Sequence, residues 1–353
     1  MQDPSGAMAR TSNHKPYELK VHWHPAFELL TSLHVYMHSA LRRVSDLGSE
    51  WRRTVKGMLP PAYAARLESL AKGPDFGIAS WLAFVLAWAG SERWPSLEDL
   101  LSWAEDLEQA ELYACIGDHL PQTEGPLAAV TTKLLADPGR YRDAAVTLMR
   151  GWHEAYFRTL DPAILAGLAQ EAAEQRLNLP AAEPAALVES LSRGLVLAPP
   201  GDIRTVALVP QHHARPWNTF EHLRDTLVIA YPAEILRPAP GQPPTRLVRL
   251  TKALNDPNRL RILRFIATAP RGFGEIVSHL GLAKSTVHHH LVTLRAAGLL
   301  RWETRLGLAG EGRAQLSLAG LDELMPQLMA FLKAQDNGSE PEADLEAHSI
   351  GLY

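Results

Sequence analysis

Residues 260–318 read LRILRFIATAPRGFGEIVSHLGLAKSTVHHHLVTLRAAGLLRWETRLGLAGEGRAQLSL and carry a regular hydrophobic pattern. Apolar residues recur at helical spacing on both sides of Gly281: Ile276, Val277 and Leu280 before it, and Val287, Leu291 and Leu294 after it. Gly298 stands where a helix C-cap needs a residue that tolerates positive φ. The spacing predicts a helix-turn-helix whose second helix is available for a DNA groove.

Two short apolar runs follow the predicted helices and enclose a glycine-rich tip. LLRWETR and RAQLSL flank LGLAGEGR, which predicts a β-hairpin wing. Arg305 and Arg313 lie at the base of this tip, where guanidinium groups can contact the DNA backbone or the minor groove. An ordinary hairpin with solvated arginines remains the alternative.

The second predicted helix presents polar residues opposite its apolar stripe. With that stripe turned inward, Ser285, His288 and His289 face outward, whereas His290 falls at the core boundary. Hydroxyl and imidazole groups suit phosphate and base-edge contacts, and the first amides of a helix favour a phosphate. The candidate DNA-contacting residues of this helix are Lys284, Ser285, Thr286, His288, His289 and Arg295.

The motifs of residues 246–334 together resemble the ArsR/SmtB family of winged-helix repressors. KALNDPNRLRILRFI, STVHHHL and LRAAGLL occur in the family's order and spacing. The resemblance implies a homodimer on double-stranded DNA, with His288 and His289 on the DNA side and the flanking apolar helices forming the dimer surface. Two recognition helices would then lie about one DNA turn apart on a pseudo-palindrome. The preceding region resembles an extension of unknown function found ahead of some ArsR-type domains.

The metal sensors of that family carry ligands that this chain lacks. One type has paired cysteines in the helix before the turn, which reads EIVSHL here. Another has Asp/His clusters in the last helix, which reads LDELMPQLMAFLKA here. We therefore expect no metal sensing by the winged domain, and we expect the N-terminal domain to receive any small-molecule effector.

The charged residues are distributed unevenly along the chain. The 353 residues carry a formal net charge of −4, yet residues 246–330 hold twelve Lys/Arg against six Asp/Glu. A locally basic segment in an acidic chain suits a polyanionic partner, although this excess is modest and would not decide the matter alone.

Cysteine usage and hydropathy place the chain among cytoplasmic proteins without a membrane partner. The single cysteine, Cys115, excludes an intrachain disulfide framework and is expected to be a buried apolar residue. The first residues lack the apolar core of a secretion signal. The apolar run at 76–90 is too short for a membrane span, and we expect a buried helix there.

The N-terminal part is expected to be helical, with Ser96 and Asp161 as N-caps and no strand before residue 200. IRTVALVP (203–210) and TLVIAYPA (226–233) are expected to pair as strands. The fold class is thus mainly α: a helical N-terminal domain with a small β element and a C-terminal winged helix-turn-helix of the α+β type. The expected divisions are a disordered arm or expression remnant (1–16), a helical sensor domain (17–236), a proline-rich linker (237–244), the winged helix (245–334) and an acidic flexible tail (335–353).

Two sets of residues in the N-terminal part could bind ligands. His34 and His38 are four apart on a predicted helix and could chelate a metal together with His22 or His24; half-buried histidines beside an apolar stripe are the alternative. The second set could bind a planar or anionic molecule, or instead belong to a structured loop that packs its indole on the core. It comprises His212, His213, Arg215 and Trp217.

The sequence therefore predicts a DNA-binding transcriptional regulator, a dimeric repressor whose DNA affinity is modulated through the N-terminal domain. No nucleophile elbow, phosphate-binding glycine loop or HExxH motif occurs, so we expect neither an enzyme nor a cofactor beyond the possible histidine metal site. The alternatives are an N-terminal metal-binding, ligand-binding or enzymatic module with DNA binding secondary, and an N-terminal domain that only enlarges the dimer interface.

Overall fold

The structure is a computed structural model, and it describes residues 17–73, 75–120, 126–197, 202–236, 241–304 and 312–333. The predictions made for the N-terminal arm (1–16), for Arg305 and for the acidic tail (335–353) lie outside these residues, as do residues 237–240 of the predicted linker.

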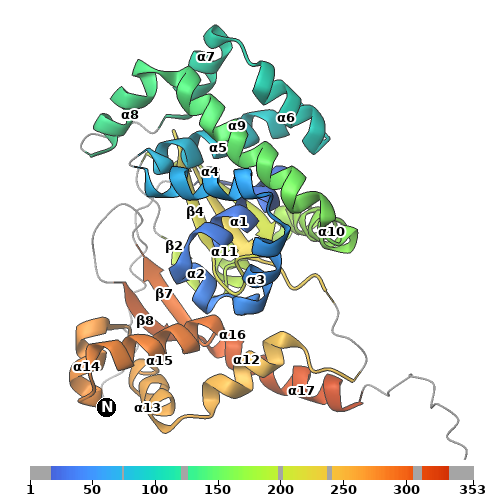
Figure 1. The fold of residues 1–353 in the computed structure, drawn as a ribbon. Coiled ribbons are helices and arrows are strands. Elements are labelled where there is room, and N and C mark those ends of the chain that lie inside the picture. The colour runs from blue at the N-terminus through green and yellow to red at the C-terminus, as the bar shows by residue number, and fades with distance from the viewer. Residues whose placement is uncertain are drawn as a thin grey trace, which may run out of the picture.

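Eleven α-helices of the N-terminal part are described (Figure 1). They are α1 (Pro25–Met37), α2 (Ser39–Val44), α3 (Gly48–Met58), α4 (Pro61–Lys72), α5 (Phe76–Ser91), α6 (Leu97–Asp106), α7 (Gln109–His119), α8 (Pro126–Ala136), α9 (Pro138–Ala155), α10 (Pro162–Asn178) and α11 (Pro184–Leu191). Ser96 accepts a hydrogen bond from the Asp99 amide at 3.1 Å, and Asp161 accepts one from the Ala163 amide at 2.9 Å. Both N-cap predictions are confirmed.

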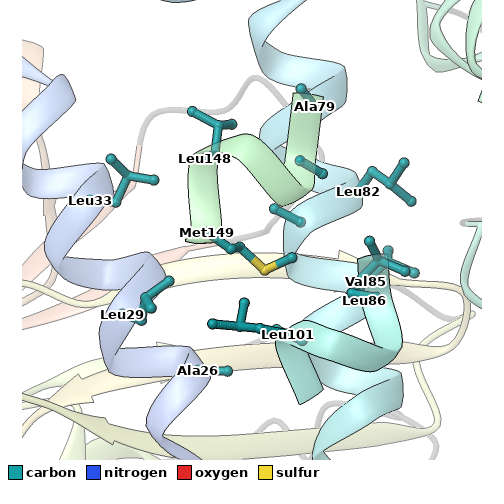
Figure 2. Close-up of a cluster of buried hydrophobic side chains, with 14 of the residues drawn as sticks. Ala26, Leu29, Leu33, Ala79, Leu82, Val85, Leu86, Leu101, Leu148 and Met149 are labelled. Carbon is teal, nitrogen blue, oxygen red and sulfur yellow. The ribbon is translucent and has the colours of Figure 1, made fainter. Parts of the chain in front are cut away.

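Helix α5 lies at the centre of the helical core. Leu82, Val85 and Leu86 are completely buried, which confirms the buried helix expected at 76–90. Figure 2 shows these side chains facing residues of α1, α6 and α9, among them Leu101 and Met149. No helix among the described residues is long and apolar enough to cross a membrane.

A four-stranded sheet lies beside this helical core. Its strands are β1 (Glu18–Val21), β3 (Thr205–Gln211), β5 (Thr226–Pro232) and β4 (Thr219–Leu223), in that spatial order, and only β4 is antiparallel to its neighbour. Successive side chains of the strands point to opposite faces of the sheet. Val209 and Val228 pack on the helical core. Leu208 and Ile229, on the other face, pack with residues of α10 and α11. The predicted pairing of residues 203–210 with 226–233 is confirmed.

The C-terminal part is a winged helix. Its elements are α12 (Thr245–Leu254), α13 (Pro257–Ile266), β6 (Arg271–Gly272), α14 (Phe273–Leu280), α15 (Lys284–Ala296), β7 (Leu300–Thr304), β8 (Arg313–Leu316), α16 (Leu318–Asp322) and α17 (Leu324–Lys333). Gly281 ends α14 with φ 68°, and Gly298 follows α15 with φ 72°. The turn, the helix stop and the mainly α fold class are therefore confirmed.

The wing sheet contains a strand from the N-terminal part of the chain. β2 (Leu195–Leu197) pairs in parallel with β7, so that the order is β2-β7-β8-β6. Gly194 precedes β2 with φ 101°, and the Trp302 amide donates a 2.6 Å hydrogen bond to its carbonyl oxygen. The expectation of no strand before residue 200 was wrong, because β1 and β2 are too short to show a period and their partners lie far along the chain.

Candidate nucleic-acid interface

Helix α15 presents a polar, exposed face at its N-terminal end. Lys284, Ser285, Thr286, His288 and His289 are exposed, whereas the apolar stripe that begins at Val287 is buried. The residue before the helix, Ala283, provides no side-chain cap. The first amides of α15 therefore remain available for a phosphate oxygen.

The third histidine of the run has a different environment. His290 is only 6% exposed, and its Nδ1 lies 3.9 Å from a carboxylate oxygen of Asp256. Asp256 itself caps α13 by accepting a hydrogen bond from the Arg259 amide at 2.9 Å. His290 therefore packs in the domain core, while the two preceding imidazoles point outward.

Arg295, nearer the C-terminal end of α15, lies against two indole rings. Its guanidinium is 6.0 Å from the ring centre of Trp217 and 5.7 Å from that of Trp302. Burial lowers the pKa of Arg295. These residues border a cavity of about 290 Å³ together with His288 and Val292. A loop of the N-terminal part thus contacts α15 directly.

Arg313, on the wing, is exposed but turned toward α14. Its Nη2 donates hydrogen bonds to the Pro270 carbonyl at 2.7 Å and to the Glu275 carboxylate at 3.3 Å. The pKa of Glu275 is lowered by a hydrogen bond from the Gly272 amide and by Arg271 and Arg313. A DNA phosphate would have to compete with Glu275 for the guanidinium of Arg313.

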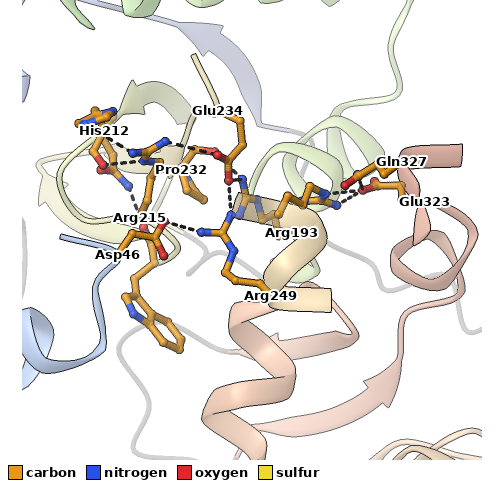
Figure 3. A network of polar contacts seen from close by, with 12 residues as sticks. Asp46, Arg193, His212, Arg215, Pro232, Glu234, Arg249, Glu323 and Gln327 are labelled. Carbon is orange, nitrogen blue, oxygen red and sulfur yellow. Dashed lines mark hydrogen bonds and ion pairs between the residues drawn. The ribbon is translucent and has the colours of Figure 1, made fainter. Parts of the chain in front are cut away.

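A network of ionic contacts joins α12 to the N-terminal part (Figure 3). Arg249 of α12 pairs with Asp46 and with Glu234. Glu234 also pairs with Arg193 at 2.6 Å and with Arg215 at 3.3 Å. Burial raises the pKa of the Glu234 carboxyl, but the three guanidinium groups outweigh that effect and lower it to about 2.

Two further ionic contacts involve residues of the winged helix, one within it and one to α11. Arg246 of α12 pairs with Glu323 just before α17, and Gln327 donates to the same carboxylate at 3.3 Å. Arg301 of β7 donates to Glu189 of α11 at 2.8 Å. The N-terminal part therefore contacts α12 and β7 of the winged helix through charged side chains.

The four residues expected to line one ligand site have separate environments. The backbone amides of His212 and His213 each donate to Glu28 at 3.0 Å, and the His213 ring is bonded to Glu28 and, at 2.7 Å, to the Tyr156 hydroxyl. Arg215 belongs to the ionic network, and Trp217 donates to the Val44 carbonyl at 2.9 Å. Trp217 borders the cavity beside α15, whereas none of the other three residues lines that cavity or the one between α1, α5 and the sheet. These contacts correspond to the structured-loop alternative.

The four histidines considered for a metal do not converge. His22 Nε2 lies 2.7 Å from the Ser91 hydroxyl, and His24 caps α1 by accepting from the Ala26 amide. The rings of His34 and His38 stack at 4.0 Å. Within the described ranges, the group of three ligand atoms lying within 4.8 Å of one another is a different one: Glu98, His153 and Glu154. Glu98 of that group is exposed and already paired with Arg150.

One residue that the sequence did not single out lies in a cavity. Glu221 of β4 borders a space of about 240 Å³ between α1, α5 and the sheet. The alternation of TFEHL along β4 places Glu221 and Thr219 on one face, which is the signal that could have identified it.

Comparison with known proteins identifies the helix-turn-helix segment. Residues 256–301 match the family model described as bacterial regulatory protein, arsR family. The HTH-type transcriptional regulators CmtR of Mycobacterium bovis and Mycobacterium tuberculosis are each 44% identical to this chain over 54 residues, which is 15% of this chain and 46% of the relative. The chain thus spans about half the length of the curated relatives it matches, and no solved structure matches it. These matches confirm the resemblance to the ArsR family that the motifs of this segment indicated.

Proposed function

We propose that this protein is a cytoplasmic transcriptional regulator that binds a pseudo-palindromic operator as a homodimer and acts as a repressor. The observation that carries this proposal is the exposed polar face of α15 within a segment matching the arsR family. Lys284, Ser285 and Thr286 would contact phosphates, and His288 and His289 would reach base edges. The basic balance of residues 246–330 supports such a partner.

An exposed apolar surface supports the dimer. Helices α12 and α17 contact each other, and both present large apolar side chains to solvent. They are Val248, Met325, Met329 and Leu332. Contiguous exposed apolar side chains on adjoining helices are typical of an interface, and a second copy of the same surface is the partner that the two-fold symmetry of an operator requires.

The contacts between the two parts of the chain support modulation through the N-terminal domain. Trp217 contacts α15, and Arg249 ties α12 to Asp46 and Glu234. A change in the N-terminal domain would therefore alter the position of the recognition helix relative to the dimer helices. The mechanism is a population shift between arrangements with different spacing of the two recognition helices, and so different affinity for DNA.

DNA binding can be tested with the full-length protein and the DNA upstream of its own gene. We expect specific binding that weakens steeply with salt, since phosphate neutralisation releases counterions. His289→Ala should weaken specific binding about 10-fold or more while leaving non-specific binding nearly unchanged. The matched control is His38→Ala, an exposed histidine on the N-terminal part. Salt-insensitive binding, or equal losses for the two variants, would contradict the proposal.

A further inference from the structure

The N-terminal domain contains a cavity bounded by α1, α5 and one face of the sheet. Its volume is about 240 Å³, slightly below the range of about 300–1,000 Å³ usual for ligand pockets, which suits a compact molecule. Most of the lining is apolar, including Phe27, Phe84 and Val228. The rings of Phe27 and Phe84 lie 5.9 Å apart, so that a flat apolar group could contact both.

The cavity is lined by one carboxyl group without a basic side chain to balance its charge. Glu221 projects from β4 into the cavity, whose lining contains no lysine or arginine. Within the described part of the chain, no hydrogen bond or ion pair involves its carboxyl group. The other polar residues of the lining are Thr31 and His34 of α1, Ser80 of α5 and Thr219 of the same strand.

An ionised carboxylate in such surroundings is unfavourable. Desolvation raises the pKa of Glu221 to about 7, with no charged neighbour to oppose it. A ligand with a positive charge would remove this penalty by pairing with the carboxylate, whereas an anionic ligand would meet a like charge. The lining thus selects by charge as well as by apolar contact.

We propose that this cavity binds a compact organic cation, an apolar ring system bearing a protonated amine, whose ammonium group pairs with Glu221 while the ring packs against Phe27 and Phe84. The ligand would donate hydrogen bonds to the Glu221 carboxylate, with the Thr219 and Ser80 hydroxyls near enough to the cavity to serve as additional acceptors.

The cavity is connected to the DNA-binding helix by a short length of chain. Thr219, Phe220 and Glu221 line the cavity, and Trp217, two residues earlier, contacts Arg295 of α15. A ligand that repositions β4 would therefore move an indole that touches the recognition helix. This consequence rests on the proposed function, whereas binding to the cavity does not.

The proposal can be tested with three probes that share a ring and a chain but differ in charge: 3-phenylpropylamine, 3-phenylpropanol and 3-phenylpropanoate. Their binding to the full-length protein would be measured by calorimetry at pH 8, where Glu221 is ionised. We expect the amine to bind at least 10-fold more tightly than the alcohol, and the carboxylate to bind most weakly. Glu221→Gln should abolish the difference between amine and alcohol.

Two further variants separate charge recognition from general damage. Ala83→Leu, which adds bulk at an apolar position of the lining, should weaken the amine and the alcohol alike by about 10-fold. Glu50→Gln, an exposed acid on α3, should bind all probes as the native protein does. No binding of the amine, equal affinity for amine and alcohol, or a preference that survives Glu221→Gln would overturn the proposal.

Operator affinity would be measured on the same samples with and without the amine. We expect the amine to change the affinity of the native protein and not that of Glu221→Gln. A protein that binds the amine but no DNA would contradict the proposed function and leave the cavity assignment in force. A protein that binds DNA but not the amine would contradict the cavity assignment and leave the proposed function in force.

Discussion

Two carboxyl groups of the N-terminal domain have opposite surroundings. Glu234 is held by three guanidinium groups, which lower its pKa to about 2, and its charge therefore stabilises the fold at neutral pH. Glu221 has no such partner, and desolvation raises its pKa to about 7. Because a raised carboxyl pKa means that the folded state binds the proton more tightly, Glu221 destabilises the fold once it ionises.

We predict that Glu221→Gln stabilises the ligand-free protein in a pH-dependent manner. Below the unfolded pKa of about 4.5 both states are protonated and the substitution changes little; the penalty grows as the pH rises and is complete above about 7. The gain at pH 8 should be about 2 kcal/mol, after allowing for partial solvent access. Chemical unfolding at pH 8 and pH 5 measures it, with Glu50→Gln as control. A gain of equal size at both pH values would show that the carboxyl charge is not the cause.

The structural roles of some residues could be predicted from the sequence, and those of others could not. Gly281, Gly298 and the Asp256 cap follow local rules, so their positions in the helix-turn-helix were predictable. Glu221 was not, because a single acid in a short strand reveals nothing until the helices that enclose it are placed. The sequence indicated Trp217 as a candidate ligand-binding residue, but its contact with Arg295 could not be predicted, because the two residues lie far apart in the chain.

At the scale of elements, the pairing of β2 with β7 is the contact that sequence patterns could not show. Three residues, Leu195–Leu197, are too few to display a period. The pairing depends on Gly194, since a Cβ there would lie 2.2 Å from the carbonyl oxygen of Leu300. Its φ of 101° also disfavours any residue with a side chain. A local glycine thus permits the N-terminal part to extend the wing sheet.

We predict that Gly194→Ala separates β2 from β7. Steric overlap with a backbone oxygen and a strained φ should cost about 2 kcal/mol or more. Hydrogen exchange at the Trp302 amide, which donates to the Gly194 carbonyl, should become faster. The control is Gly57→Ala in α3, where a Cβ meets nothing within 4 Å and where alanine should stabilise the helix by about 1 kcal/mol. Unchanged exchange at Trp302 in Gly194→Ala would contradict the prediction.

At the scale of the whole molecule, the winged helix is held against the N-terminal part by charged contacts on one side and has exposed apolar side chains on another. Arg249 and Arg301 make the charged contacts, and α17 carries much of the apolar surface. Arg246, on the same helix as Arg249, pairs with Glu323 just before α17. This arrangement would let a change in the N-terminal domain reach the proposed dimer surface and the proposed DNA-binding helix together, as modulation of operator affinity requires.

The proposed dimer surface leads to a prediction about the assembled protein. Met329→Glu places a charge on the exposed apolar face of α17, and it should convert a dimer to a monomer, since burying an unpaired carboxylate is costly. Sedimentation measures the mass, and operator titration should show affinity for paired half-sites falling about 100-fold or more while binding to one half-site changes little. Met58→Glu, on α3, is the control, because Met58 is similarly exposed outside this surface. A dimer that persists in Met329→Glu would mean that the two copies meet elsewhere, and the spacing of the recognition helices would then have to be derived from that other surface.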